Sequence, residues 1–249
     1  MKRLYIIKAG TTFSATAKQF GDFDTWTITA LGKVNVEICT LDAEHGAALP
    51  AAVECAGVVI TGSHAMVTDD LSWSMKIEEW IPSLLKASTP FLGICYGHQL
   101  LARAAGGQVG FHPRGKEIGT VAIQLQPECV KDALFQSLPQ SFLVHTTHSQ
   151  TVLRLPSSAT RLATNAYEPN HAFRLGECAW GVQYHPEYNA NIMRSYIEAQ
   201  ADELETTELD VPGLLCAVTE TPIAAKTLRN FSRFFEERLF EKANADNGI

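Results

Sequence analysis

The segment at residues 90–107 limits most narrowly what this chain can fold into. Residues 90–94 form an apolar run of strand length, and residues 98–105 have helical spacing and end at a Gly-Gly pair. Between them, the pentapeptide GICYG places Cys95 at the centre of a G-x-nucleophile-x-G frame. A strand that turns sharply into a helix is the building unit of a sheet covered by helices. The segment therefore predicts an α/β fold.

Other apolar runs of strand length precede this segment. They lie at residues 4–8, 34–39 and 57–60, and helical spacing covers residues 72–87. Pro82 weakens this helix locally, because proline lacks the N–H that an inner helical turn uses. Short apolar strands separated by helices are typical of a parallel sheet that is covered on both faces. The first half of the chain therefore predicts a mostly parallel central sheet.

The second half has a different pattern. Strand-like runs at residues 118–125, 141–147, 160–165 and 179–184 have few long helices between them, which indicates mixed or antiparallel additions to the sheet. Residues 189–243 are mostly helical, and we expect their aromatic side chains to pack against the sheet. Since no repeat or linker interrupts the pattern, we expect one domain over residues 1–249. Its core would span about residues 1–190 and its helical C-terminal extension about residues 190–245.

Composition excludes several classes of protein. The 249 residues are 46% hydrophobic and 19% charged, so the chain can bury a core and is not mainly disordered. A net charge of −7 argues against binding to duplex nucleic acid or to an anionic membrane surface. No apolar run approaches the roughly 20 residues of a membrane span, and the first ten residues do not read as a signal peptide. We therefore expect a cytoplasmic protein.

None of the six cysteines lies in a CxxC pair, and we expect them to be reduced, because the sequence is not that of a small secreted chain with a signal peptide. Five of them are interpreted as small apolar packing residues, namely Cys39, Cys55, Cys129, Cys178 and Cys216. Cys95 is different, because a sharp strand-to-helix turn would expose its sulfur at the carboxyl end of the sheet, where open α/β folds bind ligands. The dipole of the following helix would favour the thiolate. Cys95 is therefore the candidate nucleophile.

A nucleophile of this kind needs a base, and the base needs an orienting group. Of the eight histidines, His185 has the best local context, because it ends a predicted strand and Glu187 follows two residues later. Residues two apart in extended chain face the same way, so Glu187 can hold the imidazole. His98 lies three residues after Cys95 but has no acidic neighbour, which predicts a packing role. The sequence thus predicts a Cys95–His185–Glu187 triad.

Four segments now carry a family resemblance: TGSHAMV (61–67), FLGICYGHQLLARAAGG (91–107), HSQTVLRLP (148–156) and GVQYHPE (181–187). Their order and spacing resemble those of class I glutamine amidotransferases, and most closely the amidotransferase part of GMP synthase and its free-standing relatives. The resemblance implies that Cys95 attacks the side-chain amide of glutamine and forms a thioester. His185 would then supply and remove protons, and Glu187 would hold His185. The expected fold is a single-domain, flavodoxin-like three-layer α/β fold.

The resemblance also implies binding residues. The oxyanion would be held by main-chain N–H groups of Tyr96 and of the turn at Gly62 and Ser63, where many relatives have Gly-Gly-Pro. Gln99 matches a glutamine that contacts substrate. The segment His148-Ser149-Gln150 matches the one near the α-amino and α-carboxyl groups of the substrate. Relatives commonly have an acid where this chain has Gln150, and a neutral amide attracts a substrate ammonium less strongly.

The sequence leaves the acceptor of the ammonia open. The chain has no SGG-type nucleotide loop, and the near match to a phosphate loop at residues 110–117 lacks the hydroxyl residue that would hold Mg²⁺. No cofactor and no metal are predicted. Either a separate synthetase subunit consumes the ammonia, or the chain acts alone on γ-glutamyl compounds as a peptidase. A non-catalytic binding protein on the same fold is the third alternative. The sequence leaves the oligomeric state of the chain open.

Overall fold

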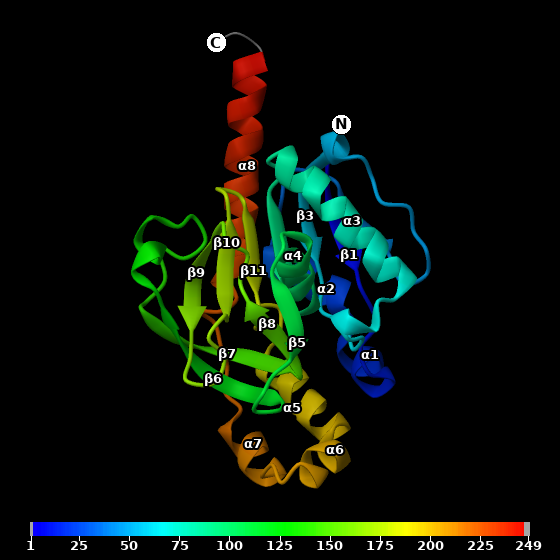
Figure 1. The fold of residues 1–249 in the computed structure, drawn as a ribbon, viewed down its shortest axis with the longest axis vertical. Coiled ribbons are helices and arrows are strands. Elements are labelled where there is room, and N and C mark those ends of the chain that lie inside the picture. The colour runs from blue at the N-terminus through cyan, green and yellow to red at the C-terminus, as the bar shows by residue number, and fades with distance from the viewer. Residues whose placement is uncertain (1, 247–249) are drawn as a thin grey trace.

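A computed structural model describes residues 2–246. Its centre is a sheet whose strands run in the order β2-β1-β3-β4-β11-β10-β9-β6-β7 (Figure 1). The first five of these strands pair in parallel, and they are β1 (Arg3–Lys8), β2 (Ile38–Asp42), β3 (Cys55–Ile60), β4 (Phe91–Ile94) and β11 (Ala179–Val182). Parallel strands end at one edge of a sheet, so the segments that follow β3, β4 and β11 are brought together there.

The other four strands of the sheet pair in antiparallel fashion. They are β6 (Glu117–Leu125), β7 (Ser141–His148), β9 (Ala159–Thr164) and β10 (Ala172–Leu175). A separate antiparallel ribbon consists of β5 (Gln108–Phe111) and β8 (Gln150–Arg154). The antiparallel additions predicted for the second half of the chain are confirmed.

Helices cover both faces of the sheet, and the alternation of side chains along β1 shows how. Leu4 and Ile6 belong to one buried cluster, which also holds Phe231 of α8. Tyr5 and Ile7 belong to the opposite cluster, which is built on α3 and α4. Successive residues of a strand point to opposite faces, so β1 supplies both cores. The helices are α1 (Ser14–Phe20), α2 (Phe23–Leu31), α3 (Ser72–Lys86), α4 (Tyr96–Ala104), α5 (Ala190–Ala199), α6 (Ala201–Thr206), α7 (Val211–Ala217) and α8 (Lys226–Asp246), with short 3₁₀ turns at Ala52–Glu54, Val67–Asp69 and Pro127–Lys131.

The C-terminal helices divide between two places. Figure 1 shows α5, α6 and α7 gathered with α1 at one end of the molecule, while the free end of α8 projects from the other end. Phe231 and Phe235 of α8 are fully buried beneath the sheet. The aromatic residues of the tail therefore pack against the sheet, as the sequence predicted. No helix in the described range is both long enough and apolar enough to cross a bilayer.

The predicted α/β fold class is confirmed, but some element boundaries are not. The strand predicted at residues 34–39 begins only at Ile38. Val34 and Val36 instead pack against the buried cluster from a loop, and the main-chain N–H of Asn35 donates to Glu236 of α8 at 2.6 Å. The alternation of apolar residues at 34–39 thus has a different cause, which is the contact between this loop and α8. The helices α1 and α2 and the strands β5, β8 and β10 were not predicted.

Candidate active site

Cys95 occupies a strained junction between β4 and α4. Its φ is +48°, in the left-handed region that L-residues rarely adopt. Its main-chain N–H donates to Val182 O of β11 at 2.8 Å, which holds the turn in that conformation. Helix α4 begins at the next residue, Tyr96. The sulfur therefore lies at the positive end of a helix dipole.

The two glycines of the turn are required by close backbone contacts. A Cβ atom at Gly93 would lie 2.3 Å from the carbonyl oxygen of Gly97. A Cβ atom at Gly97 would lie 2.5 Å from the carbonyl oxygen of Ile60 in β3. Both distances are shorter than any real contact of a Cβ atom, so the strand, the turn and the helix can approach only without side chains at these positions. This confirms the collision that the sequence predicted.

The sulfur of Cys95 is nearly buried and has polar neighbours. The Gln183 side-chain amide donates to Sγ at 3.4 Å, and Thr147 O lies 3.8 Å away. Because Gln183 follows the end of β11, it reaches the sulfur from the strand that pairs with β4. An N–H donor at this distance stabilises negative charge on sulfur. Sequence reasoning missed Gln183, although it stands two residues before His185 and so faces the same way in extended chain.

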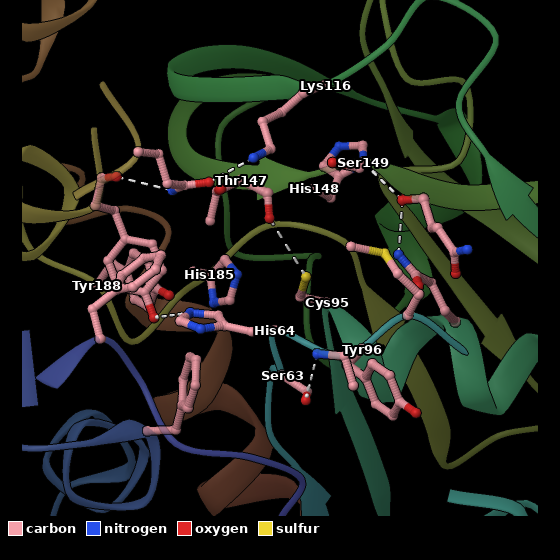
Figure 2. Close-up of a pocket in the computed structure, with 18 of the residues that line it drawn as sticks. Ser63, His64, Cys95, Tyr96, Lys116, Thr147, His148, Ser149, His185 and Tyr188 are labelled. Carbon is pink, nitrogen blue, oxygen red and sulfur yellow. Dashed lines mark hydrogen bonds between the residues drawn. The ribbon is translucent and has the colours of Figure 1, made fainter. Parts of the chain in front are cut away.

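His185 and Glu187 meet at the same sheet edge as Cys95. In the register of β11 with β4, Val182 lies opposite Ile94, so both chains leave the sheet at the same level. His185 Nδ1 lies 2.8 Å from Glu187 Oε1, and both side chains are buried. The main-chain N–H of His185 donates to His145 O at 2.8 Å, which fixes the segment. Figure 2 shows the imidazole of His185 beside Cys95.

The electrostatics favour a charged His185. Burial alone would lower its pKa, but the Glu187 carboxylate and the Cys95 sulfur, through charge and hydrogen bonds, raise the pKa to about 10. Two other buried histidines differ. Burial lowers the pKa of His98 to about 3 and that of His145 to about 4. His98 packs against Phe173 at 4.9 Å between ring centroids, which fits its predicted packing role.

The predicted oxyanion residues lie around the same cavity. Ser63 and Tyr96 line it with Cys95 (Figure 2). Gly62 borders the base, since a Cβ atom there would lie 2.8 Å from Cε1 of His185. The Tyr96 N–H is one of the first N–H groups of α4, which have no acceptor within the helix. The turn that follows β3 and the first residue of α4 thus meet at this cavity.

The predicted substrate residues also line the cavity, where they bond mostly to one another. Gln99 Nε2 donates to Gln150 O at 2.8 Å, and His148 Nδ1 lies 2.9 Å from the same oxygen. The Gln150 side-chain amide donates to Thr68 Oγ1 at 2.5 Å. Ser149 lines the cavity between these two residues. The structure thus brings all four together, with the Gln150 side chain turned to the loop that carries Thr68.

A buried ionic group supports this segment from behind. Glu117 Oε2 lies 3.0 Å from His148 Nε2 and 3.3 Å from His171 Nε2. Asn165 donates to the other carboxylate oxygen at 2.7 Å. Burial opposes the charge on Glu117, but the bonds from His148 and His171 hold its pKa below the usual range. Sequence reasoning missed this group, because its members come from β6, β7 and the segment before β10.

Comparison with known proteins now decides the family. The family model "Glutamine amidotransferase class-I" matches residues 20–202. The chain belongs to the class I glutamine amidotransferases. It resembles gamma-glutamyl peptidase 5 of Arabidopsis thaliana, with 35% identity over 144 residues, which is 57% of this chain and 57% of that protein. It also resembles the glutamine-hydrolyzing GMP synthase of Aeropyrum pernix, with 39% identity over 152 residues, or 61% of this chain and 27% of that protein.

A solved structure supports the assignment at the level of the fold. The glutamine amidotransferase of Thermotoga maritima superposes with a TM-score of 0.73 at 28% identity, over 94% of this chain and 97% of that one. The chain spans little more than half the length of the peptidase and about a quarter of the length of the synthase. The family match and the shared fold confirm the resemblance to class I glutamine amidotransferases that the sequence predicted.

Proposed function

We propose that this chain hydrolyses the γ-amide of glutamine or of a γ-glutamyl compound through a thioester on Cys95. One observation carries the proposal. The sulfur of Cys95 lies at a helix N-terminus beside a buried His185, whose Nδ1 is bonded to Glu187 at 2.8 Å. This arrangement sets a nucleophile beside an imidazole that a carboxylate orients, as a cysteine hydrolase requires.

The reaction takes two steps on these residues. The Cys95 thiolate attacks the γ-carbonyl carbon, and a C–S bond forms. As the C–N bond breaks, His185 gives its proton to the leaving nitrogen, so ammonia or an amine departs. Water then loses a proton to His185 and attacks the thioester, and the C–S bond breaks to release glutamate and the thiolate. The net reaction consumes one water for each amide and needs no electron transfer.

The other cavity residues would hold the oxyanion and the substrate. Main-chain N–H groups of Tyr96, Gly62 and Ser63 would hold the oxyanion, and loss of one such donor typically slows an enzyme about 10²–10³-fold. Gln99, His148, Ser149 and Gln150 would hold the glutamyl portion. Because the nucleophile, the acid and the oxyanion donors all come from the chain, the proposed reaction requires no cofactor. Among the residues whose side chains the structure describes, 2–241, no group of three or more His, Cys, Asp or Glu residues is placed to hold a metal ion.

Two versions of the reaction differ in what becomes of the nitrogen. In one, the chain acts as a glutaminase that supplies ammonia to a separate synthetase subunit, as the likeness to GMP synthase suggests. In the other, it acts alone as a γ-glutamyl hydrolase, as the likeness to a gamma-glutamyl peptidase suggests. Turnover of γ-glutamyl substrates by the purified chain would favour the second version. Glutaminase activity that arises only with an added synthetase would favour the first.

Labelling with a diazo-ketone analogue of glutamine tests the proposal. We expect the reagent to modify Cys95, and we expect Cys95→Ser and His185→Ala to abolish hydrolysis while the fold is retained. The internal control is Cys216, which is solvent-exposed but has none of the triad neighbours. Modification of Cys216 with Cys95 left intact, or full turnover by Cys95→Ser, would refute the enzyme proposal and favour a binding protein on this fold.

A further inference from the structure

The cavity at Cys95 is also lined by side chains that the proposed hydrolysis of glutamine does not use. Its walls include Phe13, His64 and Tyr196 in addition to Lys116. Figure 2 shows His185, His64 and Tyr188 on one side of Cys95 and Tyr96 on the other. We call the part bounded by Phe13, His64, Tyr196 and Lys116 the amine compartment, because it would hold the substituent of the leaving nitrogen.

The chemistry of the triad fixes which half of a substrate would enter this compartment. His185 must lie next to the leaving nitrogen, because it supplies that nitrogen with a proton. Any substituent on the nitrogen therefore extends past His185. Phe23 stacks near His185 with ring centroids 6.3 Å apart, and it lies 6.1 Å from His64. Phe23 thus links His185 to His64, and the amine compartment adjoins His185 within one cavity.

The wall of the amine compartment is aromatic and open to solvent. The rings of Phe13 and His64 are 4.2 Å apart, and Phe13 is half-buried while His64 is exposed. Tyr196 stands behind them and its hydroxyl lies 3.3 Å from His64 Nε2. Partial loss of hydration beside the surrounding rings, together with the positive charge of His185, lowers the pKa of His64, which favours an uncharged ring. Such a wall suits an apolar group, whereas departing ammonia would gain nothing from it.

Lys116 places a cation at the edge of the same compartment. Its Nζ donates to Gln200 Oε1 at 2.6 Å and to Glu203 Oε1 at 2.7 Å. The Lys116 side chain is only 14% exposed, whereas that of Glu203 is 61% exposed. Gln200 in turn donates to Tyr196 O at 2.9 Å, so the cation is tied to the end of α5, the helix that carries Tyr196. An exposed carboxylate is a weak partner that a substrate carboxylate can replace.

We propose that the amine compartment binds the amine half of a γ-glutamyl amino acid that has an apolar side chain. The apolar side chain would lie on Phe13 and His64, and the carboxylate would replace Glu203 on Lys116. This inference rests on the proposed function and specifies its substrate. The bond that breaks is the γ-amide C–N bond, His185 gives its proton to the nitrogen, and water completes the release of glutamate and a free amino acid.

Three synthetic substrates test the inference on the full-length chain. γ-Glutamyl-phenylalanine carries both the ring and the carboxylate, γ-glutamyl-glycine lacks the ring, and γ-glutamyl-phenethylamide lacks the carboxylate. We expect kcat/KM for γ-glutamyl-phenylalanine to exceed that for each of the other two by about tenfold or more, since burying an aromatic ring and forming a charged hydrogen bond each contribute that much. We also expect it to exceed kcat/KM for glutamine.

Variants separate the two recognition elements. Lys116→Met is expected to lower the ratio of kcat/KM for γ-glutamyl-phenylalanine to that for γ-glutamyl-phenethylamide by about tenfold. Phe13→Ala is expected to lower the ratio of γ-glutamyl-phenylalanine to γ-glutamyl-glycine. Glu203→Gln is expected to lower KM for γ-glutamyl-phenylalanine, because it removes the competing carboxylate. Lys76→Met, at an exposed position on α3, is the matched control and should leave every ratio unchanged.

The outcomes distinguish this inference from the proposed function. If glutamine is hydrolysed with a kcat/KM equal to or above that of γ-glutamyl-phenylalanine, the inference is wrong while the proposed function stands. The same holds if Lys116→Met and Phe13→Ala leave both ratios unchanged. If neither glutamine nor any γ-glutamyl amide is hydrolysed and Cys95 resists the diazo-ketone, the proposed function itself is wrong.

Discussion

At the residue scale, the charge on His185 is set by its two neighbours. The Glu187 carboxylate and the Cys95 sulfur raise its pKa to about 10 against the opposing effect of burial. Turnover needs the imidazolium, so we expect kcat/KM for glutamine to fall with an apparent pKa near 10. Glu187→Gln should move this alkaline limb to lower pH, because the variant removes the largest favourable charge. Glu205→Gln, at an exposed position on α6, is the control. An alkaline limb that does not move in Glu187→Gln would contradict the pairing.

The same pKa shift predicts how stability depends on pH. His185 binds its proton more tightly in the folded protein than in the unfolded chain, whose histidine pKa is about 6.5. Its contribution to the free energy of unfolding is therefore complete below about pH 6.5 and is lost as the pH rises through about 10. We expect the difference in Tm between the parent chain and Glu187→Gln to shrink between pH 6 and pH 10.5. A difference that grows over this range would reverse the assigned sign.

The grouping of the three proposed triad residues could be predicted from sequence, because each has a local signal. Cys95 stands between two glycines, and His185 and Glu187 share one extended segment. Gln183 carried the same strand signal and could have been found. Lys116 had no local signal. Its partners Gln200 and Glu203 lie in the helical segment after residue 190, and only folding brings them to Lys116.

At the element scale, the junction of β4 with α4 depends on Gly97. A Cβ atom there would meet backbone of β3 at 2.5 Å, whereas one at Gly57 would meet the flexible end of Leu4 at 3.2 Å. We expect Gly97→Ala to lower the free energy of unfolding by about 1–3 kcal/mol and Gly57→Ala by less. Urea unfolding measures both. In addition, Gly97→Ala should slow alkylation of Cys95, since the turn must shift. Equal effects of the two variants would show that the close contact at Gly97 does not matter.

Glu117 joins three elements behind the glutamyl side of the cavity. It begins β6, bonds His148 at the end of β7, and contacts His171 just before β10. Glu117→Gln leaves buried histidine nitrogens without a charged acceptor, and we expect a loss of about 1–3 kcal/mol in the free energy of unfolding. Its pKa is lowered, so this contribution is present above the usual carboxyl range and is lost only in stronger acid. An unchanged Tm at pH 7 would show that the group does not support the fold.

The elements that sequence reasoning missed share a physical cause. Helix α2 has the sequence FDTWTITAL, in which aromatic and β-branched residues favour a strand by propensity. Its helical state comes from the Asp22 cap and from burial of Phe23 and Trp26. The strand β10 is only four residues long and pairs with β9 and β11, which are its neighbours in the fold. Tertiary contacts decided these elements, and a single sequence does not display them.

At the scale of the whole molecule, α8 packs against β11, the strand that leads to His185. Trp180 of β11 contacts Phe231 and Phe234 of α8, with ring centroids 6.4 and 4.8 Å away. The hydroxyl of Tyr184, next to His185, bonds to Thr227 of α8 at 2.8 Å. The boundary predicted near residue 190 therefore does not separate two independent cores. We propose that the core and the helical extension unfold as one unit.

Phe231→Ala tests this cooperation. Phe231 is fully buried, so its truncation should lower the free energy of unfolding by about 3–5 kcal/mol. Phe240 on the same helix is 70% exposed, and Phe240→Ala should change the free energy of unfolding by about 0.5 kcal/mol or less. Urea unfolding would be followed by far-ultraviolet circular dichroism and by exposure of Cys95 to a thiol reagent. If one cooperative unit contains both α8 and the active site, the two probes have a common midpoint, and Phe231→Ala moves both by the same amount. Separate midpoints, with Cys95 protected after α8 has unfolded, would instead establish residues 1–190 as a core that folds without its extension.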